Sequence, residues 1–195
     1  MKPFSNYNET QVFSDRAVLP AGGYIAKIKK AAVRTYSGQN GEFQKLEIAF
    51  DISEGEYKDY FSNDLKGQKS EDKKWKGVLR LFVPVDDGSE RDGKTKSIFK
   101  GNIEAVEDSN SGYHWDWDEN KLSGKTVGVI FRNEEWEFNG NTGWKAQPFK
   151  FISDEKIRQG KFKLPADKPL RQTQTIPQSK SVEDFEEIDD EDVPF

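Results

Sequence analysis

The sequence predicts a mainly β domain: a five-stranded Greek-key barrel with one helix between the third and fourth strands, followed by a disordered acidic tail. Three observations support this fold class. Apolar and polar residues alternate in several short runs, most clearly where Leu46, Ile48, Phe50 and Ile52 share one face. One segment, residues 97–108, has apolar residues at helical spacing instead. Turn-forming residues separate these runs, so we expect consecutive strands to pair as hairpins.

The first half of the chain is expected to supply three or four strands and the helix. Residues 23–33 and 45–52 alternate as strands, and a turn rich in Gly and Asn lies between them. Residues 57–61 are expected to form a short third strand, and residues 78–83 form a further alternating run. The helix over residues 97–108 follows, with Phe99, Ile103 and Val106 on its apolar stripe.

The second half is expected to form a long hairpin and a short helix. Residues 125–138 and 144–152 flank an Asn- and Gly-rich turn, which is a strong hairpin signal. Ser153 and Gly160 are expected to begin and end one or two helical turns. This order of elements matches the OB-fold, a five-stranded barrel with a helix after its third strand; a split sheet with one packed helix fits nearly as well.

Composition divides the 195 residues into a domain (1–164), a flexible linker rich in Pro, Gln and Thr (165–182) and an acidic tail (183–195). The tail has 8 acidic residues among its 13 and no Lys or Arg, so repulsion and ordering entropy predict that it stays mobile. The rest of the chain carries 30 Lys and Arg against 27 acids, a net charge of +3. A polyanion binder whose tail competes for its own groove fits this division, and so does a near-neutral domain with a solubilising tail.

Several classes of protein are not expected. The chain has no cysteine, so disulfides and thiolate metal sites are excluded. The N-terminus lacks an apolar signal core and no run reaches membrane-spanning length, so we expect a cytoplasmic protein. No nucleophile–base pair, Walker loop or dinucleotide fingerprint is present, so we expect neither catalysis nor a cofactor.

Two weaker motifs are interpreted as structural. The acidic loop containing Asp86, Asp87, Glu90 and Asp92 offers oxygen ligands for a divalent ion, as in a nuclease, but it lacks the ligand spacing of an EF-hand. We therefore favour a solvated turn and expect no metal site. His114 has no second His or Cys to join it, and the neighbouring Trp115 and Trp117 are flanked by Asp, so we expect a structural plug there.

The end of the chain carries the most specific motif. Asp189, Asp190, Glu191 and Asp192 precede Val193, Pro194 and Phe195. This tip resembles that of bacterial and phage single-stranded DNA-binding proteins, which end in acids followed by Pro-Phe. In that family the terminal Phe ring enters an apolar pocket on a partner, while basic residues hold its carboxylate and the upstream acids. The resemblance implies that residues 189–195 recruit replication or recombination proteins.

The domain resembles a second family, encoded in the replication modules of phages and prophages and long known only as a domain of unknown function. The resemblance lies between about Gly22 and Pro169, in the strings GGYIAKIKKA, LEIAFDISEGEYKDYF, SNSGYHWDWD, LSGKTVGVIF, EWEFNGNTGW and DEKIRQGKFKLP. It implies single-strand binding through the modules in which that family occurs. None of these strings is a catalytic signature.

Aromatic rings beside cations are the candidate contacts for a single strand, because bases stack on rings and phosphates pair with Lys and Arg. Any one ring is otherwise a core or surface residue. Trp136 is a weaker candidate because acids surround it. The candidates lie near the first turn, around the fourth alternating run and at the hairpin end: Arg34, Tyr36, Lys45, Trp75, Lys76, Arg80, Phe82, Trp144 and Lys145.

The sequence therefore predicts a non-enzymatic single-stranded DNA-binding protein of a phage or prophage. An oligomer that combines several sites would raise its affinity. The alternatives are a recombination mediator or annealing accessory, an adaptor acting mainly through the tail, and a metal-dependent nuclease using the acidic loop. A DNA mimic fits the tail, but the net positive charge of the rest of the chain argues against it.

Overall fold

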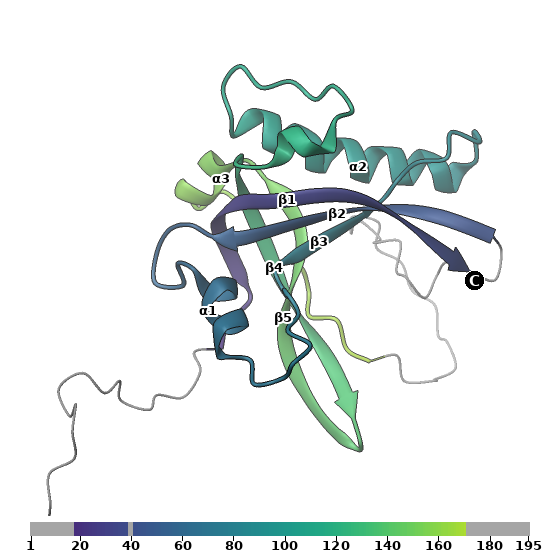
Figure 1. Cartoon of the computed structure of the whole chain (residues 1–195). Coiled ribbons are helices and arrows are strands. Elements are labelled where there is room, and N and C mark those ends of the chain that lie inside the picture. Colours follow the sequence, from purple (N-terminus) through teal and green to yellow (C-terminus); the bar gives the residue numbers. More distant parts are fainter. Residues whose placement is uncertain (1–17, 39–40, 171–195) are drawn as a thin grey trace, which may run out of the picture.

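The computed structural model describes residues 18–38 and 41–170, which form one antiparallel sheet with helices packed around it (Figure 1). Its five strands have the order β3-β2-β1-β4-β5, which confirms the mainly β prediction. The strands are β1 (Gly22–Gly38), β2 (Gly41–Ile52), β3 (Val78–Phe82), β4 (Thr126–Phe138) and β5 (Asn141–Ile152). The helices are α1 (Tyr60–Gly67), α2 (Glu90–Asp108), α3 (Asp154–Arg158) and the 3-10 helix η1 (Glu119–Leu122).

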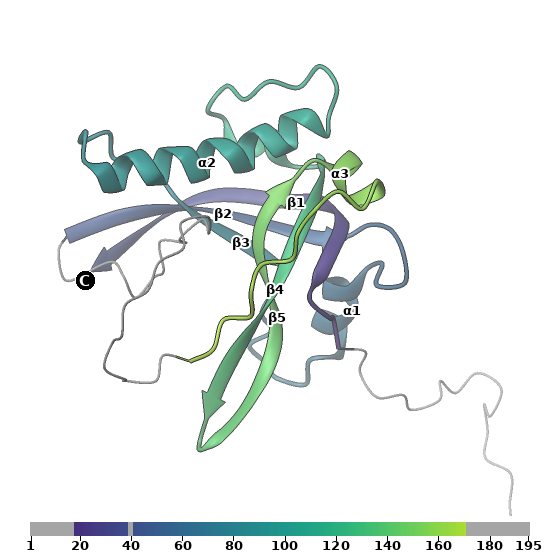
Figure 2. The same cartoon turned by 180° about the vertical axis from the view of Figure 1, so that it is seen from behind.

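Strand β1 joins the two halves of the sheet. Its first residues, Gly22–Lys27, pair with β4, and the stretch from Ala26 to Gly38 pairs with β2. A register shift between Ile28 and Lys30 marks a β-bulge, which bends the strand at the point where it leaves β4. The β1–β2 and β4–β5 hairpins consequently point in different directions, as Figures 1 and 2 both show.

The core lies on the inner face of the sheet and beneath α2. Leu46, Ile48, Phe50 and Ile52 are each at most 1% exposed, as their alternation predicts. Phe99, Ile103 and Val106 on α2 are buried as well. The helix begins at Glu90, seven residues earlier than the predicted start at 97, because the Ser89 hydroxyl accepts the Asp92 N–H and caps it.

The prediction of a short strand at residues 57–61 is wrong. The chain turns there and enters α1 at Tyr60. The cause lies on β2: the buried Asp51 carboxylate accepts the backbone N–H groups of Phe61 and Ser62, at 3.0 and 3.1 Å. Asp51 is 1% exposed, although the alternation predicts it on the polar face. Asp51 caps α1 from a different element, β2, so no local sequence pattern predicts this cap.

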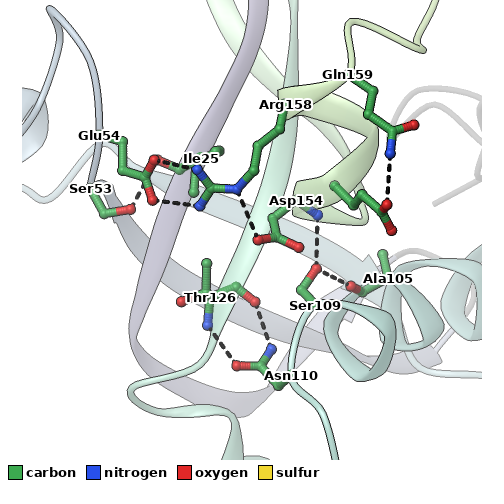
Figure 3. Close-up of polar contacts among 11 residues, drawn as sticks. Ile25, Ser53, Glu54, Ala105, Ser109, Asn110, Thr126, Asp154, Arg158 and Gln159 are labelled. Carbon is green, nitrogen blue, oxygen red and sulfur yellow. Dashed lines mark hydrogen bonds and ion pairs between the residues drawn. The ribbon is translucent and has the colours of Figure 1, made fainter.

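Polar contacts connect the ends of α2 and α3 to the sheet (Figure 3). Arg158 on α3 pairs with Glu54 through both terminal nitrogens, at 2.8 and 2.7 Å. The Ser109 hydroxyl accepts the Asp154 N–H and donates to the Ala105 carbonyl. These contacts connect the predicted final helix, which lies where Ser153 and Gly160 place it, to the loop after β2 and to the end of α2.

Asn110 connects the end of α2 to the first residue of β4. Its Nδ2 donates to the Thr126 carbonyl at 2.7 Å, and its Oδ1 accepts the Thr126 N–H at 3.1 Å. Replacing Asn110 by Ala leaves both backbone groups unpaired, so we expect a loss of about 1–3 kcal/mol in the free energy of unfolding. Urea unfolding measures this. The exposed Asn63→Ala serves as the control, and an equal loss in both variants would contradict this role for Asn110.

The chain after α3 returns to the sheet. Lys168 donates its backbone N–H to the Asn133 carbonyl at 2.8 Å, and its carbonyl accepts the Glu135 N–H at 2.9 Å. This bridge occupies the edge of β4 beyond the residues that pair with β1. The first residues of the segment predicted as a linker therefore follow β4 as far as Leu170. The rest of that segment and the acidic tail lie outside the described residues.

Candidate nucleic-acid interface

Three aromatic rings lie side by side on the outer face of β1, β2 and β3. Tyr36 pairs with Phe43 across the β1–β2 ladder, and Lys45 pairs with Phe82 across the β2–β3 ladder. The Tyr36 and Phe43 rings stack at 5.5 Å with an interplanar angle of 13°, and Phe43 meets Phe82 at 5.6 Å. All three side chains are half-buried. We call Tyr36, Phe43 and Phe82 the aromatic platform.

Lys45 holds the platform together. Its ammonium lies 4.5 Å from the centroid of the Phe82 ring, and 5.5 and 5.6 Å from those of Phe43 and Tyr36. These distances allow cation–π attraction to all three rings. Lys45 is only 6% exposed, so it places a positive charge among the rings and offers little surface of its own to a ligand.

Glu47 and Arg80 complete this face. Glu47 Oε1 accepts the Tyr36 hydroxyl at 2.6 Å and Arg80 Nε at 2.9 Å. Burial alone would raise the pKa of Glu47, but the hydrogen bonds from Tyr36 and Arg80 outweigh it and the pKa lies below its ordinary value. The same hydrogen bond to Glu47 raises the pKa of Tyr36. At neutral pH the face therefore carries an ionised carboxylate between a phenol and a guanidinium.

A groove of about 630 Å³ adjoins the platform. Strands β3 and β5 and helix α2 form its walls. Phe82 of the platform and the neighbouring Arg80 both line the groove. β3 and β5 are the two edges of the sheet, so the groove lies where the sheet does not close on itself. Its lining includes three lysines, Lys150, Lys156 and Lys168, in addition to Arg80, against the acids Glu104, Asp108 and Glu134.

The structure brings five of the nine candidate residues together. Tyr36 and Phe82 belong to the platform, and Arg34 lies opposite Lys45 in the β1–β2 register on the same face. Arg80 pairs with Glu47 in the β2–β3 ladder. Arg34 is exposed, which leaves its guanidinium accessible to a phosphate. The grouping arises because the outward residues of neighbouring strands meet in register.

Trp75 and Lys76 lie elsewhere. The Trp75 indole is half-buried against the core, and its Nε1 donates to the Phe50 and Gly77 carbonyls at 3.1 Å each. The indole hydrogen bonds therefore hold the loop before β3 against β2. Lys76 is exposed and forms an ion pair with Asp64 of α1 at 3.2 Å. Neither residue shares a face with the platform, because the pairing of Val78 with Ala49 places them at the far end of β3 from Phe82.

Trp144 and Lys145 lie on the β4–β5 hairpin, which extends away from the platform (Figure 2). Trp144 is 49% exposed and pairs across the ladder with Glu135; Lys145 pairs with Glu134. These residues are accessible, but an acid stands opposite each of them. Being successive residues of a strand, they point to opposite faces of the hairpin, and both lie apart from the platform.

Phe43 and the groove lysines are not among the site residues that the sequence predicts. Phe43 falls at the start of β2, before the clear alternation begins, so its place beside Tyr36 depends on the register of the hairpin. Lys150, Lys156 and Lys168 come from three distant segments, and only the tertiary structure assembles them around one groove. The alternation of β2, extended backwards from Lys45, was the one available signal for Phe43.

The acidic loop and the WDWD motif have structural roles. Asp92 accepts the backbone N–H groups of Val85 and Asp86 and pairs with Lys96. Within residues 18–38 and 41–170, no group of three or more His, Cys or acidic side chains is placed to hold a metal ion. Trp115 packs against the core as predicted, whereas Trp117 is 75% exposed and covers Phe99 with one face.

No protein-family model matches the chain, and no curated protein matches it. Within the described part of the chain, no helix combines the length and apolar composition needed to cross a membrane. The geometry of the site is therefore the basis for any assignment. Flat rings offer stacking surfaces for bases, and the surrounding cations offer partners for phosphates.

Proposed function

We propose that this protein binds single-stranded DNA without acting as an enzyme, in the replication or recombination of a phage or prophage. The observation that carries this proposal is the aromatic platform, continuous through Arg80 and Phe82 with a groove whose lining has four cations against three acids. Stacking contributes about 1–3 kcal/mol per base in proteins that bind single strands. The platform offers such surfaces, and Arg34 and the groove lysines offer charges for the sugar–phosphate backbone.

The fold supports the same proposal as an OB-like barrel. In an OB-fold the second and third strands, with the loops after the first and fourth strands, bind oligonucleotides. Here Phe43 and Phe82 lie on β2 and β3, and Tyr36 lies near the end of β1. The groove between β3 and β5 occupies the position where the barrel would close.

A single strand suits this face better than a duplex. Bases in a duplex are stacked on one another and present only their edges in the grooves. A base must leave that stack before a ring can pack against its face. The site offers three neighbouring aromatic rings, so it favours a strand whose bases are already free to pack against them.

The test is a titration of the full chain with a fluorescent single-stranded oligonucleotide and a matched duplex, each at low and moderate salt. We expect tighter binding to the single strand, with an affinity that falls as salt rises. The slope of log K against log salt should be about -0.7 for each phosphate neutralised. Equal affinity for the duplex, or no binding at either salt concentration, would contradict the proposal.

The acidic tail is proposed to recruit partner proteins and to compete with DNA. Deleting residues 183–195 removes 8 negative charges, so we expect DNA binding to tighten modestly. We also expect capture of replication proteins from a host lysate to be lost, because the terminal Phe195 and its carboxylate are gone. Weaker DNA binding by the truncated chain would contradict the competition, and unchanged capture would contradict recruitment.

A further inference from the structure

The aromatic platform has a carboxylate at its edge, which a surface built only for phosphate would not have. Glu47 lies next to Lys45 on β2, opposite Arg80 of β3. Its contact with the Tyr36 hydroxyl places it at the distal end of that ring. An anion here repels phosphates, so a strand bound on this face would keep its sugar–phosphate backbone away from this point and turn its bases toward it.

The two oxygens of Glu47 differ. Oε1 already accepts two hydrogen bonds, from Tyr36 at 2.6 Å and from Arg80 at 2.9 Å. Among the described residues, no hydrogen bond reaches Oε2. The Glu47 side chain is 24% exposed, so the carboxylate is within reach of a ligand. Tyr36 and Arg80 fix the carboxylate from two strands, which orients Oε2 before any ligand arrives.

We propose that Glu47 is a specificity-determining residue: it selects bases that carry an amino group on their pairing edge, and so favours cytosine over thymine. This inference rests on the proposed single-strand binding. A base stacked on Tyr36 has its edge beside Glu47, where the cytosine amino group donates to Oε2. Thymine presents its O4 carbonyl where cytosine has the amino group, and two acceptors facing each other cannot form a hydrogen bond. Its one donor, N3–H, lies between two carbonyl oxygens, so a carboxylate that accepts it is also placed against those acceptors.

Two features make this selection effective. Glu47 remains ionised at neutral pH, because the hydrogen bonds from Tyr36 and Arg80 outweigh the effect of burial on its pKa. Ionised acceptors form stronger hydrogen bonds than neutral ones. The carboxylate also has no proton to donate, so it cannot adapt to the thymine carbonyl in the way that an amide would.

Cytosine and thymine homopolymers of equal length give a matched comparison, because the two bases are pyrimidines of similar size. We expect the full chain at neutral pH to bind the cytosine homopolymer about tenfold more tightly, the lower end of the range for one good base contact. In Glu47→Gln the amide can donate as well as accept, so the preference should fall to about twofold or less. Glu155→Gln, on the surface of α3, is the charge-matched control and should keep the full preference.

The outcomes separate this inference from the proposed function. Tight but equal binding of both homopolymers by the unsubstituted chain, or a preference that Glu47→Gln retains, would overturn the role of Glu47 and leave single-strand binding intact. Binding of neither homopolymer would overturn single-strand binding and this inference with it. A thermal unfolding curve for Glu47→Gln that matches the unsubstituted chain ensures that a lost preference reflects recognition and not a damaged fold.

Discussion

Phe82→Ala is expected to weaken single-stranded DNA binding by about five- to a hundredfold. The substitution removes one stacking surface, and stacking contributes about 1–3 kcal/mol per base. It also removes the ring closest to the Lys45 ammonium, at 4.5 Å, and opens the platform where it meets the groove. Fluorescence titration at fixed salt measures the loss, and circular dichroism shows whether the sheet is retained.

The matched control for this variant is Trp117→Ala. Trp117 is 75% exposed, so it is a large accessible ring, but it lies beside α2 and between two Asp residues. We expect its removal to change DNA affinity by less than about twofold. If the two variants lose affinity equally, exposed aromatic area and not the platform determines binding.

Asp51→Ala is expected to lower the free energy of unfolding by about 3–5 kcal/mol. The Asp51 carboxylate is buried and accepts the backbone N–H groups of Ile52, Phe61 and Ser62, together with the Ser62 hydroxyl. Truncation leaves these donors unpaired in the interior, and each unpaired buried donor costs about 1–3 kcal/mol. The cost falls within the large-effect class of substitutions that break a buried polar network.

Urea unfolding with two further variants tests this account. Asp51→Asn keeps one acceptor oxygen but turns an amide N–H₂ toward the remaining donors, so we expect an intermediate loss of about 1–3 kcal/mol. Asp72→Ala, in the exposed loop before β3, should change stability by less than about 0.5 kcal/mol. A loss for Asp51→Ala no larger than that for Asp72→Ala would show that the helix does not depend on this cap.

Elements with local signals were predictable. The alternation of Leu46, Ile48 and Phe50 gives β2 and its buried face, because a strand turns successive side chains to opposite sides. The stripe on α2 follows from the helical period in the same way. The turn before β5 needs residues that tolerate positive φ, and Asn139 and Gly140 have φ values of 51° and 76°.

Elements fixed by distant partners were not predictable. Helix α1 depends on Asp51, a residue of β2 that looks like a surface acid in an alternating strand. Trp75 looked like a binding ring beside Lys76 and Arg80, but its indole N–H finds carbonyls on Phe50 and Gly77. In both cases a hydrogen bond to a distant part of the chain determines whether the side chain is buried or exposed. Periodicity in the sequence carries no information about such a bond.

The candidate site also has one part that the sequence predicts and another that only the tertiary structure determines. Periodicity and residue type by themselves placed Arg80 and Phe82 on a strand and Tyr36 near the turn after the first strand. Only the register of β1, β2 and β3 joined them with Phe43 into one platform, buried Lys45 among the rings and set Glu47 against Tyr36. The physical reason is that local patterns encode which face of a strand a residue occupies, while cross-strand pairing determines its neighbours on that face.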